Sequence, residues 1–128
     1  MKILAAGLLA AAVAYVANRF FYRLMGNTVL LGPVPIVEEV CKTMSAALLG
    51  AAVFYTHLVF GLIEALLDWR GQKKGVLPAC YGLIAHGAFG LITVAATQKT
   101  GMLIQGIFTA VIFHILWNMV MTYRTAKR

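Results

Sequence analysis

Two adjacent glutamates and a lysine stand out because they lie inside a long apolar stretch. Glu38, Glu39 and Lys42 fall within the run from about residue 28 to 67, in which hydrophobic residues dominate. A charged side chain at the centre of a bilayer costs on the order of 2.5–3.5 kcal/mol by insertion scales. The chain has only four carboxylates, so two side by side in such a run indicate a use in chemistry, in transport or in helix packing.

Further polar residues recur in the apolar segments that follow. They are Glu64, His86, His114 and Asn118. Phe60 and Glu64 are four residues apart, as are His114 and Asn118. Each pair therefore shares one face of a helix. Carboxylates and imidazoles are the groups that transfer protons in general acid–base catalysis, so these residues are candidates for a site of proton-transfer chemistry.

The composition places the chain in the membrane class. Of its 128 residues, 62% are hydrophobic and 12% are charged. A soluble domain has about 45–50% apolar residues and about a quarter charged residues. The net charge of +7 does not indicate nucleic-acid binding, because the basic residues stand at the ends of apolar segments and do not alternate with aromatic ones. We therefore expect a single all-α bundle in a membrane.

The apolar runs predict five transmembrane helices. They cover about residues 3–24, 33–51, 55–69, 76–97 and 102–123. A bilayer needs ~20 residues, so some of these spans are a little short. The exact number of helices within residues 28–67 stays open. We expect the intervening turn near residues 50–57, and we expect His57 beside it to lie at the membrane interface.

The basic residues predict the orientation. Of the eleven, eight fall in segments that would share one side, two fall on the other side, and Lys42 lies within a span. The eight include Lys73, Lys74, Lys127 and Arg128. Because cytoplasmic loops carry the excess of Lys and Arg, the N-terminus is expected outside and the C-terminus inside. The expected location is a cell membrane, plasma or inner, with lipids around a multi-pass protein. Its oligomeric state stays open, and a homo-oligomer is one alternative.

Distances from the predicted turns place the polar side chains at one depth. Glu39 lies twelve residues before the turn between the second and third helices, and Glu64 lies twelve residues after it. At 1.5 Å per residue, both are roughly 18 Å from that turn. His86 and His114 lie thirteen and fourteen residues from the turn between the last two helices, or roughly 20 Å. We expect these four side chains, with Glu38, to converge in one half of the bundle.

Taken in order, these motifs resemble those of a known group of enzymes. They are Glu38-Glu39-x-x-Lys42, Phe60-x-x-x-Glu64, a lone His86 and His114-x-x-x-Asn118. The series resembles the PrsW-type glutamate intramembrane proteases. It is also similar to the wider CAAX-protease and bacteriocin-processing (CPBP, or abortive-infection) superfamily, whose motifs are EExxxR, FxxxH and HxxxN. The resemblance covers about residues 33–123, and the glutamate that ends the second motif fits the PrsW branch better.

The resemblance implies an intramembrane endopeptidase that needs no cofactor and acts on a membrane-embedded or lipidated protein or peptide. It implies Glu38 as the base that activates a water molecule. Glu64 takes the place of a water-orienting histidine, and His86 orients that water or donates a proton. His114 and Asn118 would form the oxyanion site.

Helix spacing leaves one assignment open, because Lys42 can reach Glu38 at i+4 or Glu39 at i+3. A lysine beside one glutamate favours its ionised form. We expect Lys42 to hold Glu39 and leave Glu38 free.

Other functions stay open at this point. Two glutamates and two histidines on facing helices are ligand types for Zn²⁺, and the set would be Glu39, Glu64, His86 and His114. A scaffold or immunity protein with the same fold but no turnover is a second alternative. A small proton-coupled transporter, in which Glu64 or Glu38 takes up the proton, is a third.

Overall fold

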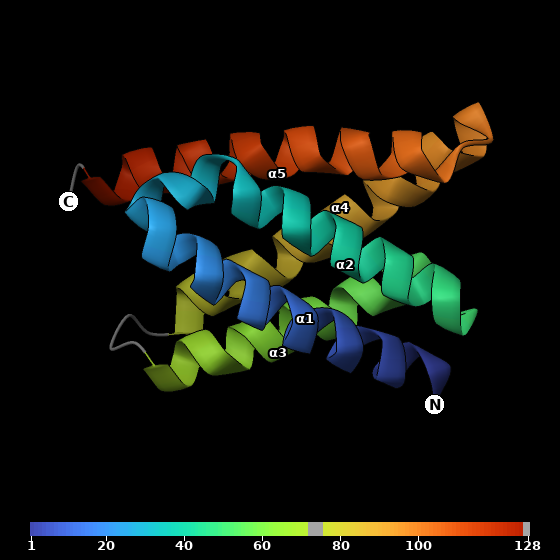
Figure 1. The fold of residues 1–128 in the computed structure, drawn as a ribbon, viewed down its shortest axis with the longest axis horizontal. Helices are drawn as coiled ribbons and strands as arrows, with labels where there is room; N and C mark the ends of the chain where they lie inside the picture. Colours follow the sequence, from blue (N-terminus) through green and yellow to red (C-terminus); the bar gives the residue numbers. More distant parts are fainter. Residues whose placement is uncertain (72–75, 127–128) are drawn as a thin grey trace.

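The computed structural model describes residues 1–71 and 76–126, and α-helices make up almost all of that part (Figure 1). The elements are α1 (Lys2–Met25), a 3-10 segment η1 (Gly26–Leu31), α2 (Pro33–Leu49), α3 (Val53–Gly71), α4 (Val76–Thr100) and α5 (Leu103–Ala126). The fold is all-helical over the described residues, with five α-helices there, as the sequence predicts. Lys73, Lys74, Lys127 and Arg128, which enter the orientation argument, lie outside the described residues.

Proline and glycine set the limits of the helices next to the polar motif. Pro33 is the first residue of α2, where its missing N–H costs nothing. Gly50 ends the same helix in the left-handed conformation, with φ 59° and ψ 39°, and its N–H faces the carbonyls of Ala46 and Ala47. Gly101 has φ 71° in the turn between α4 and α5. Glycine is favoured at both positions because positive φ is costly for residues with a Cβ.

Three helical segments are long and apolar enough to cross a membrane by length and composition: Lys2–Leu31, Val76–Thr100 and Leu103–Arg124. They indicate a membrane protein. The other two predicted spans correspond to α2 and α3, which do not meet the same criteria of length and hydropathy. The 17 residues of α2 make a helix of roughly 26 Å, shorter than the ~30 Å hydrocarbon core of a bilayer. This helix also carries the three charged residues of the first motif.

Small residues let α1 pack closely against its neighbours. Ala6, Ala10 and Ala14 recur every fourth residue and are 0–1% exposed. Gly7 faces Val59 of α3, and a Cβ on this glycine would overlap the valine side chain. Further along the chain, α3 packs on α4, α4 packs on α5, and α2 contacts both α3 and α5. The bundle thus surrounds α2 with α1, α3 and α5.

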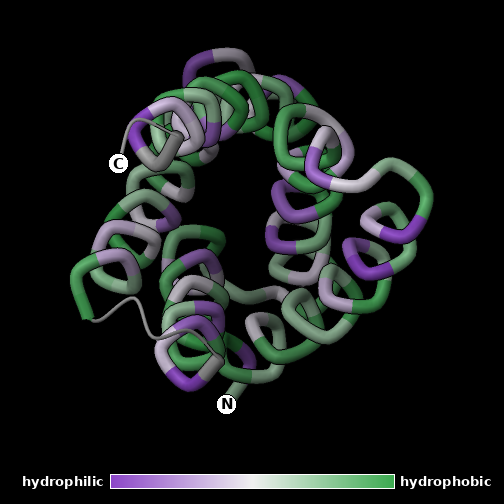
Figure 2. The backbone as a smooth tube through the Cα atoms, turned by 90° about the vertical axis from the view of Figure 1, so that its left-hand side faces the viewer, coloured by the Kyte–Doolittle hydropathy of each residue, from purple (hydrophilic) through white to green (hydrophobic). Residues whose placement is uncertain are grey.

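The polarity of the described bundle is the reverse of that in a soluble protein. Many large hydrophobic side chains are exposed, including Leu48, Ile84 and Leu91 at 57–75% exposure. Glutamate, lysine, histidine and threonine side chains are buried instead. Figure 2, viewed along the bundle, shows the helices around a common axis, with hydrophobic positions over most of each helix. This arrangement suits a protein whose outer surface contacts lipid and whose interior holds a polar site.

Candidate active site

A network of ionisable side chains from four helices lies inside the bundle. The members are Glu38, Glu39 and Lys42 of α2, His57 and Glu64 of α3, His86 of α4 and His114 of α5. Apart from Glu64, each is at most 5% exposed. Burying a charge is costly unless it is paired and hydrogen-bonded, so the partners of each group are informative.

Glu39 is held by two donors on one of its oxygens. Lys42 Nζ donates to Glu39 Oε1 at 2.6 Å, and His114 Nδ1 lies 2.8 Å from the same oxygen. A carboxylate only accepts hydrogen bonds, so His114 carries a proton on Nδ1. The open assignment of Lys42 is thereby resolved in the structure: its ion pair is with Glu39.

Lys42 also fixes His86 and, through it, Glu64. Lys42 Nζ lies 3.0 Å from His86 Nδ1. An ammonium has only donors, so Nδ1 accepts and the ring proton is on Nε2. His86 Nε2 then donates to Glu64 Oε2. The chain of hydrogen bonds runs from Lys42 through His86 to Glu64 and gives the imidazole one defined tautomer.

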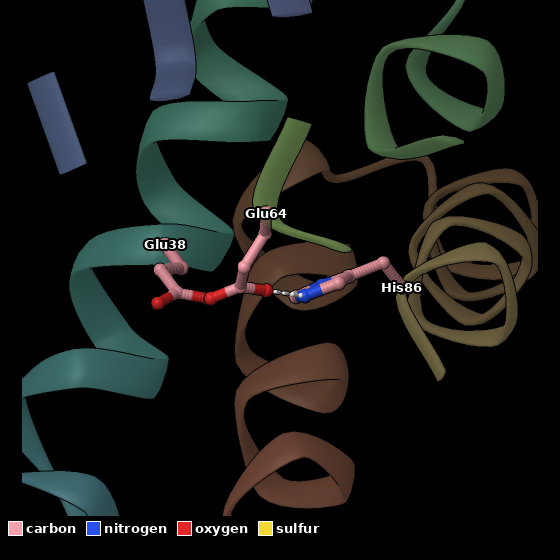
Figure 3. A group of neighbouring side chains, drawn as sticks. All are labelled: Glu38, Glu64 and His86. Carbon is pink, nitrogen blue, oxygen red and sulfur yellow. Dashed lines mark hydrogen bonds and ion pairs between the residues drawn. The ribbon is translucent and has the colours of Figure 1, made fainter. Parts of the chain in front are cut away.

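Glu38 has different partners from its neighbour. Asn18 of α1 donates its amide N–H to Glu38 Oε1 at 2.9 Å. The other oxygen, Oε2, lies 3.9 Å from His114 Nε2. Figure 3 shows that the carboxylates of Glu38 and Glu64 point toward each other, with His86 on the far side of Glu64. One potential metal-ligand atom from each of these three side chains, a carboxylate oxygen or a ring nitrogen, lies within 4.8 Å of the other two.

Glu64 is the accessible member of this group. Its side chain is 41% exposed, whereas those of Glu38 and His86 are 3% and 5% exposed. The facing carboxylates are therefore most open to the outside of the bundle on the side of Glu64.

Two phenylalanines enclose the charged groups. Lys42 Nζ lies 4.7 Å from the centre of the Phe60 ring and 5.9 Å from that of Phe89. Phe89 also stacks on His114, with ring centres 4.6 Å apart. Attraction between a cation and the face of an aromatic ring stabilises a desolvated lysine by about 0.5–2 kcal/mol. Phe60 contacts His86 edge-on as well.

Asn118 is the predicted site residue whose observed contact lies elsewhere. Its amide N–H donates to the carbonyl oxygen of Leu30 in η1 at 2.8 Å. Among the described residues it forms no hydrogen bond with His114 or with the glutamates, so in this structure its amide lies apart from the network. The physical reason is depth: one helical turn beyond His114, Asn118 is level with η1.

Sequence reasoning missed one member of the network, His57, and one residue that binds the network, Asn18. Asn18 continues the every-fourth-residue series of Ala6, Ala10 and Ala14, which was a usable signal that it faces α2. The expectation for His57 was wrong, because its side chain is fully buried instead of lying at an interface. His57 is seven residues before Glu64, two helical turns on the same face, and this spacing could have indicated its position.

The ligand set expected for a metal differs from the one that the structure brings together. In the structure, Glu39 and His114 form a hydrogen bond with each other. Within residues 1–71 and 76–126, the group with the spacing of metal ligands is Glu38, Glu64 and His86. These side chains can orient one water molecule, share a proton or bind one cation.

Comparisons with protein-family models, with curated proteins and with solved structures give no match to this chain.

Proposed function

We propose that the chain is a glutamate-type intramembrane endopeptidase of the PrsW branch within the CAAX-protease and bacteriocin-processing superfamily. Its substrate would be a membrane-embedded or lipidated protein or peptide, and its five helices would cross a cell membrane with the N-terminus outside. The observation that carries this proposal is the division between the two adjacent glutamates. Glu39 is bound by Lys42 and His114, whereas Glu38 faces Glu64 and His86.

In the proposed reaction, Glu38 takes a proton from a water molecule held between Glu38 and Glu64. The water oxygen forms a bond to the carbonyl carbon of the peptide, and the carbonyl oxygen becomes an oxyanion. The C–N bond then breaks as a proton passes to the amide nitrogen, so that a carboxylic acid and an amine leave. Glu64, whose position His86 fixes, orients the water.

His114 is better suited to proton transfer than to the oxyanion role. Its Nδ1 proton is committed to Glu39, so in its neutral form the ring presents an unprotonated Nε2 toward Glu38. This atom can receive the proton from Glu38 and give it to the leaving nitrogen. A buried carboxylate that fixes the tautomer of a histidine is a recurring arrangement in hydrolases.

Cleavage of candidate transmembrane peptides by the purified protein in liposomes tests the proposal. Glu38→Gln is expected to lower kcat by about 10²–10⁴-fold, the usual contribution of a general base. Asp68→Asn is the matched control, because it removes a carboxylate one helical turn beyond Glu64. Full cleavage by Glu38→Gln would refute the assignment.

A metal-dependent hydrolase is the second candidate function. One potential ligand atom from each of Glu38, Glu64 and His86 lies within 4.8 Å of the other two, which favours a divalent cation there. Tetrahedral Zn²⁺ with bonds of about 2.0–2.2 Å places its ligands about 3.4 Å apart, so the side chains would close inward on binding. Metal analysis of the purified protein, with Glu64→Gln as the ligand variant, separates this mechanism from the metal-free one. One metal ion per chain, lost in that variant, would favour the cation.

The two remaining functions predict different results in the same liposomes. A scaffold or immunity protein would keep the folded network but cleave no substrate. A proton-coupled transporter would show proton-dependent flux that is lost on Glu64→Gln.

A further inference from the structure

One buried carboxylate oxygen remains without a hydrogen bond. Glu39 Oε1 receives both Lys42 and His114, whereas Glu39 Oε2 has no hydrogen-bond partner among the described residues. His57 Nδ1 lies 3.7 Å from this oxygen. That nitrogen is also buried and also lacks a hydrogen-bond partner among the described residues. Two unsatisfied groups of complementary type facing each other inside a bundle require an explanation.

The other ring nitrogen of His57 indicates which tautomer is present. Thr43 Oγ1 lies 3.3 Å from His57 Nε2. If the threonine hydroxyl donates to Nε2, the ring proton is on Nδ1 and points at Glu39. The opposite tautomer would place the Nδ1 lone pair against a carboxylate oxygen in a site without exposed surface, which is repulsive. Geometry therefore selects the Nδ1–H form.

A glycine on α4 gives His57 its place. A Cβ added to Gly90 would lie 2.9 Å from His57 Cβ and 3.3 Å from Phe54 Cα. Real Cβ atoms do not approach so closely without a shift. Gly90 therefore lets α3 lie against α4 with the imidazole directed toward α2. The distance of 3.7 Å exceeds that of an ordinary N–H···O bond by about 0.8 Å, a gap that a small ring movement closes.

We propose that His57 is a positioning residue that holds Glu39 through its Nδ1–H. Glu39 then has a donor on each oxygen, and its orientation fixes Lys42, which holds His86, and His114, the proposed proton carrier. Thr43 sets the tautomer of His57, and it comes from the same helix as Glu39, one turn further along. The effect of His57 on turnover rests on the proposed function, but its tautomer and its bond to Glu39 do not.

Nitrogen NMR of ¹⁵N-histidine-labelled protein in lipid nanodiscs tests the positioning role directly. The expected spectrum shows His57 as the Nδ1–H tautomer with a proton protected from exchange. The Nε2–H tautomer would overturn the proposal. This measurement uses the unaltered chain, so a variant that fails to fold does not affect it.

A pair of variants separates positioning from packing. Asn places an N–H near the position of histidine Nδ1, whereas Leu fills the space without a donor. His57→Leu is expected to shift the His114 resonances and His57→Asn is expected to restore them. Equal His114 spectra in the two variants would contradict the role of the donor.

Cleavage kinetics add a third readout. His57→Leu should lower kcat by about 10–100-fold with KM little changed, as for a misplaced catalytic group, and His57→Asn should recover most of the loss. If the unaltered chain cleaves no substrate, the proposed function fails, while the NMR results still decide the positioning role.

Discussion

Removal of the buried lysine is the most demanding test of the network. Lys42 is 0% exposed, and its ammonium lies 2.6 Å from Glu39 Oε1 and 3.0 Å from His86 Nδ1. Lys42→Met keeps a long apolar side chain but leaves Glu39 buried with His114 as its remaining close donor. Loss of one partner of a buried ion pair costs about 3–5 kcal/mol. For a chain of this size, that corresponds to a fall in Tm of roughly 10–25 °C.

Thermal unfolding of the purified protein in detergent measures this loss. Lys99→Met is the matched control, since Lys99 is exposed near the end of α4, and its effect should stay within about 0.5 kcal/mol. The double variant Lys42→Met with Glu39→Gln should be more stable than Lys42→Met alone, because the uncompensated charge is removed. A Tm for Lys42→Met close to that of Lys99→Met would refute the ion pair, as would a double variant that is less stable than the single one.

Two further predictions concern packing around the site. Gly61→Ala would place a Cβ 2.9 Å from His86 Cβ, so we expect a loss of about 1–3 kcal/mol in unfolding free energy together with reduced cleavage. Its control is Gly82→Ala, where a Cβ meets nothing within 4 Å; a larger effect at Gly82 would contradict the close approach of α3 and α4. Asn118→Ala removes the donor to the Leu30 carbonyl and should cost about 1 kcal/mol by thermal unfolding while most of the cleavage rate is kept. A loss of kcat as large as that of a general base would instead support a role of Asn118 in the oxyanion site.

The depth of the polar side chains along the bundle could be predicted from the sequence. The rotation of each helix about its own axis, which sets the neighbours of these side chains, could not. Counting residues from the turns placed Glu39, Glu64, His86 and His114 at one level, and the structure joins Glu39 to His114 and His86 to Glu64. The helical class follows from composition and from the spacing of apolar runs. The residue count from a turn says nothing about which face of a helix meets which neighbour.

The missed residues illustrate the limit. His57 is only a few residues from the turn between α2 and α3, and polar residues near turns usually contact the interface. Its burial depends on Gly90 of another helix, a long-range contact that local patterns do not contain. Asn118 shows the converse, because the partner that it found, the Leu30 carbonyl, belongs to a 3-10 segment that was not expected.

The same reasoning explains how two adjacent glutamates acquire different roles. On an isolated helix, Lys42 could pair with Glu38 or with Glu39, and the helix itself does not decide. The neighbouring helices determine which glutamate pairs with Lys42. His114 of α5 adds a second donor to Glu39, and Asn18 of α1 binds Glu38 instead. Lys42 then completes its contacts with His86, which directs Glu64 toward Glu38. The different partners of Glu38 and Glu39 therefore result from how the neighbouring helices pack against α2, and a substitution that shifts α1 or α5 should change these partners without touching either glutamate.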